Sequence, residues 1–411
     1  MGKKIWMFIP LSLLFFLSVF YRNSSAIIAS ELMSDLSLRA SDLGLLSSSF
    51  FYAFALVQIP MGVAMDLFGP KRLIMILSSL GIVGALFFAM APSLPFSVLG
   101  RSLLGVGMAC ALMGPMKLFT VWFPVRAFAT LSGVLISIGV IGSVVATAPL
   151  AIAVDWMGWR KSFLSVALIH LFITVWIYLV VREYPKEEGR DEVIGTYGKH
   201  RWKKSMRGIR QVLSLPSFWL IALTAFVRYG TYISIAGLWA GPYLEFVYQL
   251  PLVERGKMLM SFPIGYIVGS PIFGILSDRV FKNRKGVTII GTGLYTFSIF
   301  PLIGFIPLFT PGILLMVLFC IGFFSSSGQL LYAHIKDLFP RSLSGTALTT
   351  LNLFVMGGAA FFQHIMGAMI DKFSITQGQI STEAFPFAFG FCFVAAAIGT
   401  AAYLFVKEVR L

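Results

Sequence analysis

Two arginines, Arg22 and Arg228, lie within long apolar stretches of the sequence, where an ionised side chain is costly. A guanidinium in such a place has to face a cavity, a protein partner or a ligand. Its planar array of N–H donors suits a carboxylate, a phosphate or a sulfonate. No Asp or Glu occurs near the middle of any apolar stretch, so neither arginine has an obvious counter-ion. The pattern therefore predicts a site for a small anion.

The two arginines occupy comparable places in the two halves of the chain. Arg22 precedes Asp66 by 44 residues, Arg228 precedes Asp278 by 50, and each arginine has a tyrosine beside it. A pseudo-two-fold relation between the halves would bring both guanidiniums towards one central cavity. Two alternatives stay open: Arg22 could reach the outer membrane interface through its long side chain, and Arg228 could pair with backbone carbonyls. The tyrosines expected to line the cavity are Tyr21, Tyr52, Tyr229, Tyr232 and Tyr332.

Three further ionisable residues inside apolar stretches have two interpretations each. Arg101 could act in coupling, or it could bond backbone carbonyls of the first apolar stretch as part of the packing. Lys117 could contact the substrate, or it could simply stabilise a helix C-terminus, where a positive charge is favourable. His364 could relay a proton or serve packing.

Twelve apolar stretches must position these residues, and most hold the roughly 20 residues that a helix needs to cross a bilayer. The chain is 58% hydrophobic and only 12% charged, which excludes a soluble globular protein. The N-terminal stretch imitates a signal peptide, but the six-plus-six pattern favours a first helix. The stretches lie at 5–28, 43–65, 73–92, 95–118, 127–153, 161–181, 216–243, 256–277, 288–308, 311–335, 344–369 and 384–406.

A long polar segment from 182 to 211 divides the stretches into six and six. We therefore expect an N-terminal six-helix bundle over 1–181, a cytoplasmic linker over 182–215 and a C-terminal six-helix bundle over 216–411. The linker contains a basic run, Lys199–Arg210, which could lie on anionic lipid as an amphipathic segment or could be a solvated linker.

The net charge of +15 is explained mainly by topology. With the N-terminus inside, 22 of the 32 basic residues fall on cytoplasmic segments and six on outer loops, so both termini and the linker are expected in the cytoplasm. This distribution removes the reason to expect nucleic-acid binding. The three cysteines lie in apolar runs without CxxC spacing, which predicts neither a disulfide framework nor a metal site.

A motif is repeated at the same end of the second stretch in each half. The first copy runs from Pro60 to Arg72 and contains Gly62 and Asp66; the second contains Gly274, Asp278 and Arg279. In both copies Gly and Asp are four residues apart, so they lie on one helical face. The Gly permits close approach of another helix, and the Asp can meet a basic group or a helix N-terminus. We expect both copies to act in gating.

This duplicated motif resembles the signature of the major facilitator superfamily, G-x-x-x-D-R-x-G-x-R-R, although Leu67 stands where Arg is usual. The segment Arg101–Gly107 also matches a pattern of that family, R-x-x-x-G-x-G. The resemblance covers the whole chain. It implies an all-α membrane protein with 12 transmembrane helices in two pseudo-symmetric six-helix bundles. It also implies a substrate site near the midplane, reached by alternating access.

A narrower resemblance concerns the two arginines. The segments Tyr21–Asn23, Arg228–Gly230 and Ser277–Phe281 are similar to the organophosphate:phosphate antiporters, which implies that Arg22 and Arg228 bind the anion. The chain departs from that group at Gln58 and near Ile138. The region from Arg101 through Lys117 to Pro124 is closer to organic anion transporters of the superfamily.

The sequence thus predicts a secondary active transporter of a small organic anion (carboxylate, phosphate ester or sulfonate), working by proton symport or anion exchange. One alternative is proton-coupled efflux of drugs or amphiphiles, and another is a non-transporting membrane sensor or assembly protein. No phosphate-binding G-x-x-x-x-G-K-[ST] loop and no catalytic cluster occurs. We expect no enzymatic activity, cofactor, metal or nucleic acid, and a monomer embedded in the lipid bilayer of the cell inner membrane.

Overall fold

The computed structural model describes residues 2–183, 198–304, 310–373 and 380–407, and these residues form helices joined by short loops, with no strand among them. The first half holds eight helices. These are α1 (Gly2–Asn23), α2 (Ser25–Asp35), α3 (Ala40–Phe68), α4 (Pro70–Ala89), α5 (Leu94–Met108), α6 (Met113–Trp122), α7 (Val125–Val145) and α8 (Ala148–Val180).

A separate helix, α9 (Gly198–Leu213), precedes the second half. The second half comprises α10 (Pro216–Ser234), η1 (Ile235–Trp239), α11 (Ala240–Phe246), α12 (Leu252–Leu259), α13 (Ser261–Ile275), η2 (Leu276–Val280), α14 (Arg284–Ile299), α15 (Pro301–Gly304), α16 (Pro311–Ser325), η3 (Ser326–Gly328), α17 (Gln329–Leu338), α18 (Arg341–Asp371) and α19 (Ala384–Leu404).

The expectation of 12 membrane-crossing segments is confirmed. Eleven helical stretches of the described chain are long and apolar enough to cross a membrane, and a shorter apolar helix covers Thr130–Val145. The long helix α8 is interrupted at Gly158, whose φ of 80° is not helical. Glycine tolerates this backbone conformation, and the interruption separates the end of the fifth predicted stretch from the sixth.

Several crossings are broken where the sequence suggested continuous helices. The first is divided between α1 and α2 at Ser24, and the fourth between α5 and α6 at residues 109–112. Polar side chains compete for the backbone at the first break: the Ser24 hydroxyl donates to the Tyr21 carbonyl at 3.2 Å, and the Asn23 amide donates to the Val19 carbonyl at 2.8 Å. These breaks expose carbonyl groups that other side chains can then bind.

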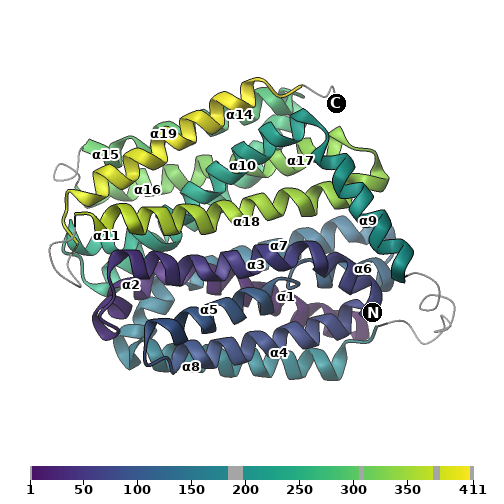
Figure 1. The fold of residues 1–411 in the computed structure, drawn as a ribbon, viewed down its shortest axis with the longest axis horizontal. Coiled ribbons are helices and arrows are strands. Elements are labelled where there is room, and N and C mark those ends of the chain that lie inside the picture. Colours follow the sequence, from purple (N-terminus) through teal and green to yellow (C-terminus); the bar gives the residue numbers. More distant parts are fainter. Residues whose placement is uncertain (1, 184–197, 305–309, 374–379, 408–411) are drawn as a thin grey trace.

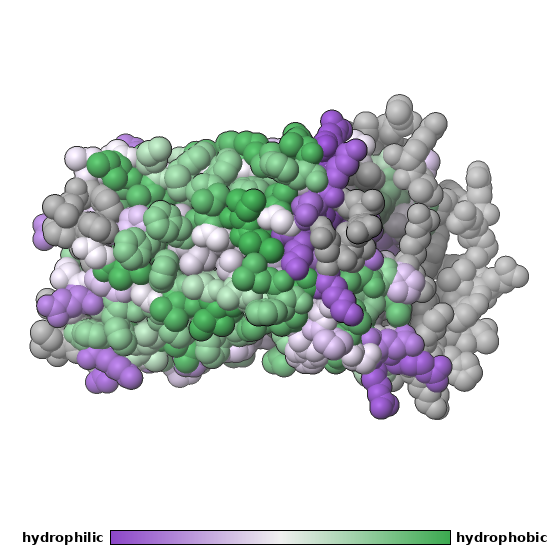
Figure 2. Space-filling model, turned by 90° about the horizontal axis from the view of Figure 1, so that it is seen from above, coloured by the Kyte–Doolittle hydropathy of each residue, from purple (hydrophilic) through white to green (hydrophobic). Residues whose placement is uncertain are grey.

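The helices run roughly along the long axis of the molecule, with α1–α8 on one side and α10–α19 on the other (Figure 1). We call the end that carries α9 and both chain ends the linker end, and the opposite end, near α2 and α11, the far end. On the face that Figure 2 shows, an apolar belt covers the middle, and hydrophilic residues lie towards the two ends. This surface is that of a multi-pass membrane protein.

Candidate functional site

Arg22 ends α1 just before the break at Ser24, and its side chain is partly buried. Its Nη2 donates to the Ser18 hydroxyl at 3.1 Å, and its Cζ lies 4.5 Å from the centre of the Phe54 ring in α3. The aromatic face stabilises the cation through the ring quadrupole. Among the described residues Arg22 forms no ion pair, so its charge is held by neutral groups alone.

Arg228 lies in α10 and is only 5% exposed. Its Nη1 donates to the backbone carbonyl of Ser325, and also to the Ser325 hydroxyl at 3.0 Å. Ser325 is the last residue of α16, directly before the tight turn of η3. Gly328 lies against the same guanidinium, and a Cβ added there would fall 2.0 Å from the Cζ of Arg228. Among the described residues Arg228 has no carboxylate partner either.

Tyrosines of the second half connect the two arginines. Tyr229 and Tyr332 each interact electrostatically with both Arg22 and Arg228, and Tyr229 also hydrogen-bonds Arg22. Arg22 belongs to the first half and Arg228 to the second. The two cations predicted to converge from opposite halves therefore share the same pair of tyrosines.

Neutral hydrogen-bonding groups complete this central cluster. The Tyr332 hydroxyl donates to the Asn352 side-chain oxygen at 3.1 Å, and the Gln329 amide donates to the Tyr266 hydroxyl at 3.2 Å. Tyr266 stacks on Tyr232, with ring centroids 6.0 Å apart. We call Arg22, Arg228, Tyr229, Tyr232, Tyr266 and Tyr332 the central cluster.

Arg101 has a different environment, although it too lies deep in the membrane-crossing part. It is completely buried in α5, and its two terminal nitrogens donate to the Tyr21 carbonyl at 3.0 Å and to the Ser25 hydroxyl at 2.8 Å. Both acceptors flank the break between α1 and α2. The rings of Phe50 and Phe88 cover its Cζ at 5.3 and 5.6 Å. This geometry matches the packing interpretation of Arg101, because both terminal nitrogens are already bonded to protein.

Other predicted residues lie apart from the arginines of the central cluster. Tyr21 is fully buried beside His170, with ring centroids 6.0 Å apart. Its backbone carbonyl accepts a hydrogen bond from Arg101. Tyr52 is 40% exposed, and its ring meets that of His364 edge-on at 6.4 Å. Tyr52 and His364 thereby join α3 of the first half to α18 of the second. Lys117 lies in α6.

Four polar residues of the site were absent from the sequence prediction: Tyr266, Gln329, Asn352 and Ser325. The only sequence signal for them is that each is a hydrogen-bonding residue inside an apolar stretch. Many similar residues elsewhere in the chain bond their own helix, so this signal has little power on its own.

The repeated motif lies at the linker end. In its second copy Asp278 is exposed and lies 3.6 Å from the Nε of Arg284, which also pairs with Asp337, while Arg279 is exposed to solvent. Asp66 of the first copy is part of α3, but its side chain lies outside the described part of the structure.

The first copy of the motif ends in a turn at Gly69, with a φ of 82°. Glu183 lies against this turn and accepts a hydrogen bond from the backbone N–H of Lys71 at 3.1 Å, at the N-terminus of α4. A carboxylate there compensates the unpaired N–H groups of the helix. Burial raises the pKa of the Glu183 carboxyl, and these backbone hydrogen bonds and the nearby Arg72 and Lys71 oppose that rise.

At the far end the two halves are joined by polar bonds. Arg255 of α12, only 4% exposed, pairs with Glu31 of the first half at 3.2 Å and also with Glu245 of its own half. The Ser41 hydroxyl donates to the Asp371 carboxylate at 2.9 Å across the same boundary. These contacts connect α2 and α3 with α12 and α18.

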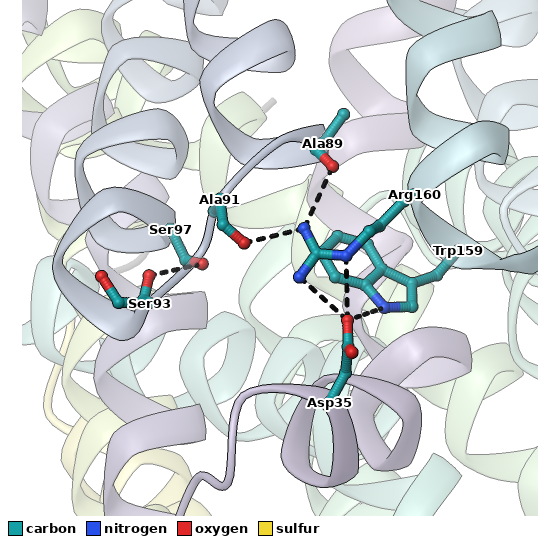
Figure 3. Close-up of polar contacts among 7 residues, drawn as sticks. All are labelled: Asp35, Ala89, Ala91, Ser93, Ser97, Trp159 and Arg160. Carbon is teal, nitrogen blue, oxygen red and sulfur yellow. Dashed lines mark hydrogen bonds and ion pairs between the residues drawn. The ribbon is translucent and has the colours of Figure 1, made fainter.

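A cavity of about 630 Å³ opens beside these far-end contacts, away from the central cluster. Glu31, Glu245 and Arg160 belong to its lining. Arg160 pairs with Asp35 at 2.9 Å and donates to the carbonyls of Ala89 and Ala91, while the Trp159 indole donates to the same carboxylate (Figure 3). These bonds tie α2, α4 and α8 together within the first half. Of the charged residues that line the cavity, Arg160 and Asp35 pair with each other, and Glu31 and Glu245 pair with Arg255.

The glycines of the two ends differ in the space around their Cβ positions. At the far end a Cβ on Gly44 would lie 2.8 Å from the Gln363 carbonyl, and one on Gly241 would lie 1.8 Å from the Ala26 carbonyl, so the halves touch backbone to backbone. Nearer the linker end four glycines on corresponding helices have open space at the Cβ position: Gly62, Gly133, Gly274 and Gly345. Gly44 and Gly241 thus let the two halves pack closely at the far end.

Twelve membrane crossings around a buried cationic and tyrosine-rich centre define a polytopic membrane transport protein. Residues 11–261 and 256–410 match the Major Facilitator Superfamily, and the chain belongs to that family. Membership confirms the predicted fold of two six-helix bundles and identifies a transporter rather than an enzyme. Among the described residues, no group of three His, Cys, Asp or Glu side chains could hold a metal ion.

The chain is similar to two curated relatives and to one solved structure. It is 24% identical to a probable sulfoacetate transporter of Cupriavidus necator over 67% of this chain and 65% of that protein. It is 26% identical to a probable L-galactonate transporter of Escherichia coli over 96% of this chain and 88% of that protein. The match thus spans about two thirds of the first relative's length.

The solved structure is an inward-facing, unoccupied bacterial homologue of the human lysosomal transporter Spinster. Its TM-score is 0.78, at 17% sequence identity, over 98% of this chain and 97% of that one. At this level of identity the likeness establishes the fold.

Proposed function

We propose that this protein is a secondary transporter of a small organic anion, and that Arg22 and Arg228 bind that anion. The observation that carries the proposal is that two guanidiniums from opposite halves share Tyr229 and Tyr332. Neither guanidinium has a carboxylate partner among the described residues. An anion placed between them would supply the missing negative charge through charge-assisted hydrogen bonds.

The substrate class follows from the donors in the central cluster. Two arginines suit a carboxylate, a sulfonate or a phosphate ester, and the surrounding tyrosine and amide groups suit hydroxyl substituents on such an anion. Both curated relatives are named for small organic anions, sulfoacetate and L-galactonate, which supports this class. An amphiphile or a cationic drug would leave the two arginines without a counter-charge.

Access to the site is proposed to alternate between the two ends. The ion pair between Arg255 and Glu31 and the close packing at Gly44 and Gly241 support a closed far end. The open space at Gly62 and Gly274 supports a path from the linker end. Bundles of 1–181 and 216–411 would then rock about the central cluster, joined by the linker 182–215. The repeated motif would stabilise one position of this movement.

The basic residues of the linker and the chain ends support a cytoplasmic linker end in a cell inner membrane. Transport would be coupled to proton symport or to exchange against another anion, with a monomer as the working unit. A bound anion draws both arginines towards itself. Occupancy of the site would therefore bring the halves together at the centre.

The proposal is tested with purified protein in proteoliposomes. A thermal-shift screen with sulfoacetate, L-galactonate and inorganic phosphate identifies the bound anion, whose uptake is then measured for the wild type and for Arg228→Ala. The account predicts at least a hundredfold loss of uptake by the variant, which should still fold and insert into the membrane. Lys282→Gln, an exposed basic residue at the linker end, is the control and should transport normally. Normal anion uptake by Arg228→Ala would contradict the site.

A further inference from the structure

The helix α9 carries a strong excess of positive charge on one side. Its 16 residues include six lysines and arginines and no acidic residue. Arg207 and Arg210 are exposed, whereas Gly208 and Val212 are buried. In sequence, Lys199 and Lys203 precede Arg207 at four-residue intervals, the spacing that places residues on one helical face. The described part of the helix is therefore amphipathic, with Arg207 and Arg210 outside.

The buried side of α9 lies against both halves of the protein. The helix contacts α18 and α10 of the second half and α3 of the first. Gly208 faces α18: a Cβ there would lie 3.3 Å from Leu343 and 3.6 Å from Thr346. In Figure 1, α9 crosses the linker end at an angle to the membrane-crossing helices. The helix therefore touches both bundles.

The helix α9 lies at the linker end of the molecule. The apolar belt of the surface gives way to hydrophilic residues towards the linker end (Figure 2). A bilayer that covers this belt has its headgroups at that level. Exposed arginines of α9 at that level would meet phosphate groups, and guanidinium forks match phosphate geometry.

We propose that the basic face of α9 binds the headgroups of anionic phospholipids in the leaflet at the linker end. Basic residues near an anionic lipid surface each increase binding roughly fivefold. Because α9 touches both halves, the bound lipid holds a helix whose partners must move relative to one another during transport. The inference concerns the linker helix and does not depend on which substrate the central cluster takes.

The experiment uses the full-length protein in nanodiscs of phosphatidylcholine alone and of phosphatidylcholine with phosphatidylglycerol. Hydrogen exchange of the α9 amides is followed by mass spectrometry. We expect exchange to slow at least fivefold in the anionic nanodiscs and the effect to shrink at high salt, because ions screen surface charge. The double variant Arg207→Gln/Arg210→Gln should lose most of this protection.

Lys282→Gln/Lys336→Gln is the matched control, because it removes two exposed basic residues from the same end but not from α9. It should keep the lipid-dependent protection. The proposal is overturned if α9 exchanges equally in both nanodiscs, or if the two double variants behave alike. A third outcome also overturns the proposal: protection is salt-sensitive but equal in both lipids, and it is lost in Glu187→Gln/Glu188→Gln. The basic face would then bind the acidic part of the same linker.

Discussion

Both halves of the protein bury an arginine against a break in a neighbouring helix, but the two arginines keep different donors free. Arg101 in the first half uses both terminal nitrogens on Tyr21 and Ser25 and is fully buried. Arg228 in the second half uses only Nη1 on Ser325. Its Nη2 has no protein partner within the described chain.

The difference indicates how the two halves divide their tasks. The first half has two arginines: Arg101 holds the helix break, and Arg22 faces the tyrosines of the other half. In the second half Arg228 bonds Ser325 through Nη1 only, which leaves Nη2 for an anion. Loss of Arg101 should therefore affect folding, whereas loss of Arg22 or Arg228 should affect the anion. The predictions below test this division, from the largest expected effect to the smallest.

Arg101→Gln should destabilise the fold most, because it leaves the Tyr21 carbonyl and the Ser25 hydroxyl without a charged donor in a buried place. Loss of two such bonds costs about 3 kcal/mol, or roughly 10 °C in unfolding temperature for a bundle of this size. Thermal unfolding in detergent measures the change. A variant as stable as the wild type but inactive would instead make Arg101 part of the transport site.

Gly328→Ala should impair function with little effect on stability. The added Cβ would displace the guanidinium of Arg228, which is the flexible end of its side chain. Anion affinity should fall about tenfold, since a misplaced charge loses its orientation. Gly345→Ala, which has open space, is the control. Equal affinity of the two variants would contradict the assigned position of Arg228.

Ser325→Ala removes one of the two hydrogen bonds that orient Arg228 but keeps the backbone acceptor. A single hydrogen bond contributes about 1 kcal/mol, so anion affinity should fall roughly fivefold. Titration of the purified variant measures this. Tighter binding in the variant would mean that Ser325 competes with the anion for the guanidinium.

Tyr332→Phe should have the smallest effect. It removes the bond to Asn352 but keeps the ring beside both arginines. Affinity should change by roughly twofold to threefold, because the lost bond is to Asn352 and not to either guanidinium. A loss above tenfold in the same titration would show that this hydroxyl binds the anion directly.

The sequence was sufficient for the fold and for part of the site. Hydropathy and the repeated motif predicted the 12 crossings and the family, because membrane helices need long apolar stretches. The pairing of Arg22 with Arg228 followed from their comparable positions, and the structure brings tyrosines from the second half to both. Their role in binding stays a prediction.

The remaining features depend on contacts that the sequence does not encode locally. Arg101 and Arg228 look alike as buried cations in apolar stretches, and only the positions of the helix breaks distinguish their partners. No proline or glycine lies beside Ser24, so the residue types there do not predict a helix break. Tyr266 and Asn352 reach the site from helices distant in sequence, so no spacing could have singled them out.

The central claim is that Arg22 and Arg228 bind one anion between the two halves. Calorimetric titration of the wild type, Arg22→Gln and Arg228→Gln with sulfoacetate and L-galactonate tests it most directly. The account predicts that an anion binds the wild type, that either substitution weakens binding at least tenfold, and that both variants remain folded without ligand. Wild-type affinity in either variant, or no binding of any anion to the wild type, would contradict it.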